Sequence, residues 1–73
     1  MTADVELAKV WLARGRIDNA AREMFSRAEL LTMAARNGDE LREWAEGERS
    51  QGYGLRAEIS TALAGTRTKW TWT

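Results

Sequence analysis

Apolar side chains recur along most of this chain at the three- and four-residue spacing that is typical of a helix buried on one side. The first such face consists of Leu7, Ala8, Trp11 and Leu12. This face predicts a helix from residue 3 to residue 14. Thr2 or Asp4 is its expected N-cap, and Gly15 is expected to end it.

A second helix is expected over residues 18–36, with Asp18 as its N-cap and with Asn37 and Gly38 as left-handed residues at its end. Its apolar positions alternate steps of four and three, which is the spacing of a heptad seam. These positions are Ile17, Ala21, Met24, Ala28, Leu31 and Ala35. The small residues would let another backbone approach closely. The seam therefore either faces the core of an intramolecular hairpin or packs against a second copy of the chain.

A third helical region, capped by Asp39, carries Leu41, Trp44 and Ala45. Three glycines, at positions 47, 52 and 54, follow within eight residues and favour a break over residues 51–54. The alternative is a single bent helix, because the four-three spacing continues across the glycines. Either way, residues 55–64 are expected to be helical, with Gly65 as the C-cap.

The last eight residues differ from the rest because threonine alternates with basic and aromatic side chains. In an extended chain, Trp70 and Trp72 lie on one side and Arg67 and Lys69 on the other. The sequence therefore predicts an all-α fold of three to four helices in a single domain over residues 1–65, followed by an extended tail over residues 66–73.

Residues 4–31 resemble one tetratricopeptide-repeat unit. Leu7, Ala8 and Trp11 match its L-G-x-x-Y segment, and Ala20 with Met24 matches its A-x-x-x-F segment. The resemblance implies a hairpin of two helices. Because no second copy follows, it does not imply the peptide-binding groove of that family.

Composition narrows the range of functions. The chain has no His and no Cys, which excludes His-based triads, thiol chemistry and zinc fingers. We therefore expect no enzymatic activity and no cofactor. The formal net charge is zero, so general nucleic-acid binding is disfavoured. No apolar run spans a membrane, and the first residues do not resemble a signal peptide, so a cytoplasmic location is expected.

Two short patterns have simpler explanations. Residues 52–57 fit the letters G-x-G-x-x-A of a dinucleotide fingerprint, but no buried strand precedes them. The acidic residues Asp39, Glu40, Glu43, Glu46 and Glu48 alternate with arginines and are expected to form a solvated helix face.

The abundance of Trp, Tyr and Arg points to protein contacts, because these side chains are enriched at interface hot spots. The expected partner-binding residues are Trp44, Arg49, Tyr53, Arg67, Lys69, Trp70 and Trp72. The expected self-association residues are Ala21, Met24, Ala28, Leu31 and Ala35, which would form a homodimer. The two tail tryptophans either pack over the fold or bind another protein.

The predicted function is that of a small adaptor or inhibitor, of the kind carried by phages and other mobile elements, which binds a cellular enzyme or regulator. The alternative is a DNA-binding regulator. In that reading, residues 41–49 and 55–64 form a helix-turn-helix with Arg56 on the second helix.

Overall fold

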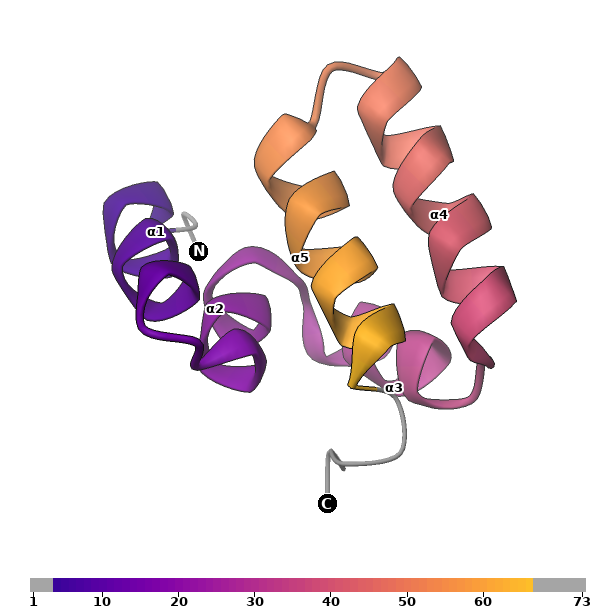
Figure 1. Cartoon of the computed structure of the whole chain (residues 1–73), viewed down its shortest axis with the longest axis horizontal. Coiled ribbons are helices and arrows are strands. Elements are labelled where there is room, and N and C mark those ends of the chain that lie inside the picture. The colour runs from indigo at the N-terminus through magenta and orange to yellow at the C-terminus, as the bar shows by residue number, and fades with distance from the viewer. Residues whose placement is uncertain (1–3, 67–73) are drawn as a thin grey trace.

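A computed structural model describes residues 4–66, and it forms five α-helices. They are α1 (Val5–Ala13), α2 (Ile17–Met24), α3 (Arg27–Ala34), α4 (Gly38–Ser50) and α5 (Gly54–Gly65) (Figure 1). Within these residues there is no strand, which confirms the all-α class. The expected tail lies outside the described residues from position 67 onward.

Helix α5 occupies the middle of the arrangement. It runs side by side with α4 in the opposite direction, and it also packs on α2 (Figure 1). Helix α1 packs on α2. The hairpin of two helices implied by the repeat resemblance is therefore present, as α1 and α2.

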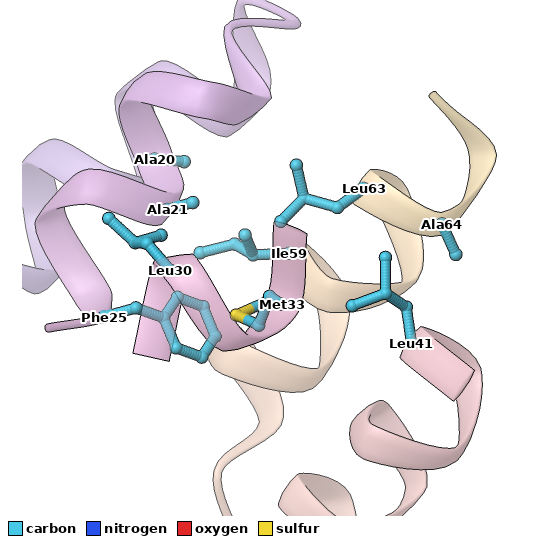
Figure 2. Close-up of a cluster of buried hydrophobic side chains, with 9 residues drawn as sticks. All are labelled: Ala20, Ala21, Phe25, Leu30, Met33, Leu41, Ile59, Leu63 and Ala64. Atoms are coloured by element: carbon cyan, nitrogen blue, oxygen red, sulfur yellow. The ribbon is translucent and has the colours of Figure 1, made fainter. Parts of the chain in front are cut away.

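Half of the buried apolar residues in the described chain have small side chains. Of the twelve buried apolar residues in the described chain, six are alanines, which allow helices to approach closely. The main buried cluster brings together Ala20, Ala21, Phe25, Leu30, Met33, Leu41, Ile59, Leu63 and Ala64 (Figure 2). Within residues 4–66, six bulky apolar side chains are buried, and they come from α3, α4, α5 and the end of α2.

The single helix expected over residues 18–36 is wrong, because the chain breaks between α2 and α3. Phe25 has extended backbone angles, with φ −119° and ψ 147°. Ser26 then caps a new helix: its hydroxyl accepts from the N–H of Glu29 at 3.1 Å, and the Glu29 carboxylate accepts from the N–H of Ser26 at 2.8 Å. This reciprocal capping box interrupts the seam, so residues 4–66 form five helices where three or four were expected.

The same reciprocal bonding starts α4. Asn37 is the N-cap, where Asp39 was expected, and it exchanges bonds with Glu40 at 2.9 and 3.0 Å. Its φ of −83° is not left-handed, and Gly38 is the first helical residue. The expectation that Asn37 and Gly38 end a helix in left-handed conformation is therefore wrong.

Four other helix ends were expected from the sequence. Gly15, expected to end α1, directly follows its C-cap Arg14 and has φ +75°. Asp4 caps α1 as expected, accepting from the N–H of Leu7 at 3.0 Å. Arg16 occupies the N-cap position of α2, and Asp18 lies in the first turn, so the expected cap at Asp18 is wrong. Gly65 is the last residue of α5, one position before the C-cap.

The glycine-rich stretch separates α4 from α5, which confirms the predicted break over residues 51–54. Gly52 has φ +86°, a left-handed conformation that favours glycine. Its N–H donates to the carbonyl of Arg49 at 3.0 Å, and the N–H of Tyr53 donates to the carbonyl of Glu48 at 2.9 Å. These bonds end α4 and reverse the chain, so the single bent helix does not form.

This turn predicts opposite effects of two glycine substitutions. Gly47→Ala, in the middle of α4 with nothing within 4 Å of the added methyl group, should raise the free energy of unfolding by about 1 kcal/mol. Gly52→Ala meets equally open space but forces alanine to a positive φ, and should lower the free energy by about 1 kcal/mol. Urea unfolding measures both changes. An equal gain from the two substitutions would contradict the left-handed turn.

Candidate functional site

A single arginine connects four of the helices. Arg56, in the first turn of α5, has its Nη2 2.5 Å from Oε2 of Glu29 on α3 and 2.8 Å from Oε1 of Glu48 on α4. Its Nη1 donates to the carbonyl of Met24, the last residue of α2, at 3.3 Å. The Arg56 side chain is only 22% exposed. The guanidinium therefore lies between the helices and fixes their relative positions.

Two aromatic rings lie close to the Arg56 guanidinium. The central guanidinium carbon of Arg56 lies 4.3 Å from the ring centroid of Phe25 and 5.8 Å from that of Tyr53, within the range of cation–π attraction. On the other side, Oε1 of Glu48 also accepts from the indole N–H of Trp44 at 3.0 Å. We call Phe25, Glu29, Trp44, Glu48, Tyr53 and Arg56 the Arg56 cluster.

Arg56 and Glu29 both keep their charges in the cluster. Burial lowers the pKa of Arg56, but its hydrogen bonds to Glu48 and Glu29 raise the pKa by more, so the group stays charged. Burial raises the pKa of Glu29, and the hydrogen bonds from Arg56 and from the N–H of Ser26 outweigh that effect, so its pKa lies below the ordinary value. Both groups are therefore ionised at neutral pH.

Three of the expected partner-binding residues lie in the described chain, and two of them are joined by the cluster. Trp44 is half-buried at the edge of the core, with the guanidinium carbon of Arg36 5.3 Å from its ring centroid. Tyr53 is 51% exposed and connects to Trp44 through Arg56 and Glu48. Arg49 is exposed at the end of α4 and pairs with Glu46.

The other four expected contact residues, Arg67, Lys69, Trp70 and Trp72, lie outside the described residues.

The expected self-association seam is divided by the helix break. Ala21 is fully buried, and Met24 is partly buried against the core cluster. Ala28, Leu31 and Ala35 are exposed together on one side of α3. The continuous seam on one helix is therefore wrong, whereas homodimer formation itself stays a prediction.

The structure also places the residue on which the DNA-binding alternative was based. Arg56 pairs with two carboxylates inside the fold, so it does not face solvent as a DNA-contacting side chain would. Helices α4 and α5 form an antiparallel hairpin (Figure 1), whereas a helix-turn-helix joins its helices at about 90–120°.

Sequence reasoning missed the role of Glu48, which was assigned to a solvated face but whose side chain is only 11% exposed. One signal was present. Glu48 and Arg56 stand four residues before and four residues after Gly52, and a tight turn between antiparallel helices brings such positions together. Glu29 carried no comparable signal, because it lies 27 residues away from Arg56 along the chain.

Comparisons with protein-family models, with curated proteins and with solved structures find no match to this chain. In the part of the chain that the structure describes, no group of three or more His, Cys, Asp or Glu side chains is placed to hold a metal ion. The helices over residues 4–66 include none that is long and apolar enough to cross a membrane.

Replacing Arg56 should destabilise the fold strongly. Arg56→Met keeps a side chain of high helix propensity but leaves the Glu48 carboxylate buried without its cation. This should lower the free energy of unfolding by about 2 kcal/mol. Breaking a fully buried ion pair costs more, about 3–5 kcal/mol, but this pair is partly exposed. The control is Arg42→Met, which removes an exposed pair with Asp39 and should cost less than about 0.5 kcal/mol. Equal losses in urea unfolding would show that the cluster contributes no more than a surface pair.

Acid should weaken the Glu29–Arg56 pair. Because the folded-state pKa of Glu29 lies below its unfolded value, its contribution is complete above the unfolded value, near 4.5, and is lost as pH falls through the folded pKa. Glu29→Gln retains an acceptor for the capping box but not the charge, and should flatten the decline of unfolding free energy below pH 4.5.

Glu40→Gln is the matched control for this pH experiment. Glu40 has the same capping role at the start of α4, and it is exposed and makes no contact with Arg56. Its substitution should leave the acid decline in place. If both variants decline with pH as the wild type does, the pair with Arg56 is not the source of the acid sensitivity.

Proposed function

We propose that this chain is a small protein-binding module that acts without catalysis, and that its contact surface is the turn between α4 and α5. The observation that supports this is that Tyr53 is exposed and also contacts a partly buried, hydrogen-bonded arginine. Its side chain is 51% exposed, yet its ring lies against the Arg56 guanidinium, which is itself bound to three other helices. An exposed aromatic side chain that packs against an ordered, partly buried group is typical of an interface hot spot.

The Arg56 cluster lowers the cost of binding at this turn. Association is opposed by the loss of side-chain and loop freedom, and a surface that is already ordered loses less. Tyr53 is the N-cap of α5, and two backbone hydrogen bonds close the turn before α5, one of them donated by the N–H of Tyr53 itself. The indole of Trp44 is also held, by its hydrogen bond to Glu48. Tyr53 is therefore presented in one position.

Arg49 extends this surface. It is exposed in the last turn of α4, and its partner Glu46 is exposed as well, so the pair is solvated and open to exchange with an acidic group of another protein. This chemistry suits an adaptor or inhibitor that binds a cellular enzyme or regulator through protein contacts. No observation favours the DNA-binding alternative, since the arginine it requires is paired inside the fold.

The test compares two variants of the full chain in affinity capture from a lysate of the source organism. The double substitution Arg49→Glu and Tyr53→Ser should abolish capture of the partner seen with the wild type. Val10→Ser changes a side chain of similar exposure on α1, and should leave the capture unchanged. With the partner purified, Tyr53→Ser alone should weaken the Kd about 30-fold, as loss of a hot spot of about 2 kcal/mol implies.

Two results would contradict the proposal. One is a partner that the double variant captures as well as the wild type does, provided that both proteins show the same helical circular dichroism. The other is binding to random duplex DNA that weakens steeply with salt, which would favour the regulator.

A further inference from the structure

The Arg56 cluster holds more negative than positive charge. The single guanidinium hydrogen-bonds through Nη2 to the carboxylates of both Glu29 and Glu48. Within residues 4–66, neither carboxylate pairs with any other basic side chain. Two carboxylates therefore share one cation, and one formal negative charge of the cluster is left without a partner of opposite sign.

Other charges near the cluster leave this excess in place. Arg27, two residues before Glu29, does not face it, because side chains two positions apart on a helix point to different sides. Arg49, next to Glu48 along the chain, pairs with Glu46 instead. The first turns of α3 and α5 add partial positive charge, whereas the last carbonyl of α2, which accepts from Arg56, adds partial negative charge. These partial charges oppose one another, so the excess stays negative.

Only one of the two carboxylates is open to another molecule. The Glu48 side chain is 11% exposed, whereas that of Glu29 is 33% exposed. Each oxygen of Glu29 accepts one hydrogen bond, from the N–H of Ser26 and from Arg56. A carboxylate offers about four lone-pair positions, so Glu29 can accept about two more bonds. A further cation would therefore be bound at Glu29.

The exposed ring of Tyr53 lies beside the same guanidinium. Its centroid is 5.8 Å from the central carbon of Arg56, whose Nη2 bonds to Glu29, so the ring and the carboxylate lie within reach of one long side chain. The face of an aromatic ring attracts cations, as a carboxylate does. Arg56 itself offers little to an acidic group, because two carboxylates share its Nη2 and its Nε is buried. This surface is therefore complementary to a basic side chain.

We infer that Tyr53 and Glu29 together bind an arginine side chain of the partner protein. The inference rests on the proposed function and names the chemistry of the partner at the same surface. Arginine fits better than lysine, because its planar guanidinium bonds a carboxylate with two donors and also stacks on an aromatic ring. Arg49, exposed in the last turn of α4, suits an acidic group. The partner then presents an arginine beside Tyr53 and an acidic residue toward Arg49.

Three capped tripeptides, which carry Arg, Lys or Glu between two glycines, test this surface on the full chain. At millimolar concentrations, the arginine peptide should saturably shift the NMR signals of the Tyr53 ring and of the Glu29 side chain. The lysine peptide should bind more weakly, and the glutamate peptide should cause no shift at these groups. Tyr53→Leu keeps an apolar side chain at an exposed position, and should remove the preference for arginine over lysine.

Glu29→Gln should weaken binding of the arginine peptide about five-fold, which is the upper end for an exposed ion pair. Glu40→Gln is the matched control, because Glu40 has the same capping role at the start of α4 and makes no contact with Arg56. It should leave the binding unchanged. Both variants keep an acceptor for their capping boxes, and helical circular dichroism checks that both are folded.

Saturable binding that prefers arginine and depends on Glu29 supports the inference. It is overturned by the absence of a saturable shift, by equal shifts with the glutamate peptide, by equal affinity of the Glu29→Gln and Glu40→Gln variants, or by an arginine preference that Tyr53→Leu leaves unchanged. Lysate capture separates this inference from the proposed function. Loss of the partner with Tyr53→Ser but not with Glu29→Gln would overturn the arginine site and leave the protein-binding module standing.

Discussion

The arrangement of α2 to α5 depends on the charged hydrogen bonds of Arg56. Half of the buried apolar residues are alanines, and burial of apolar surface has no direction, so a core this small does not by itself select one set of helix positions. The guanidinium does select one, because its planar donors reach Glu29, Glu48 and the Met24 carbonyl only in a single arrangement. A helix that moved would leave a largely buried charge without its partner, which costs more free energy than a lost apolar contact.

The break between α2 and α3 belongs to the same network. Phe25 leaves the helix and places its ring against Arg56, and the next residue, Ser26, begins the capping box. Glu29 uses one carboxylate oxygen for the N–H of Ser26 and the other for Arg56, so the start of α3 and its attachment to α5 share one side chain. The helix end and the tertiary contact are therefore formed together. This explains why a heptad pattern that runs through the break does not produce a continuous helix.

The sequence was sufficient for the helical class, for the α1–α2 hairpin and for the turn at Gly52, because each of these depends on neighbouring residues. It was misleading where local and long-range patterns compete. The spacing from Ala21 to Ala35 predicted one helix, whereas the capping residues Ser26 and Glu29, which are local signals of the S-x-x-E type, indicate two. Of the expected contact residues, Tyr53 is exposed at the turn, whereas Arg56 was considered only in the DNA-binding alternative. Its pairing with Glu29 follows from the way α3 packs, which no local pattern specifies.

The cluster also explains why an aromatic residue stands at the exposed turn. Apolar side chains replacing Arg56, Glu29 and Glu48 together would fill the same space without the cost of burying charges, and buried ion pairs seldom add stability over such a replacement. The arginine instead orients the side chains around it, because its hydrogen bonds have fixed geometry. Its guanidinium contacts the ring of Tyr53 while bound to Glu48, which also holds the indole of Trp44. Tyr53 and Trp44 are thus connected through Arg56 and Glu48 across the α4–α5 hairpin, so the proposed partner would meet two rings that are already held.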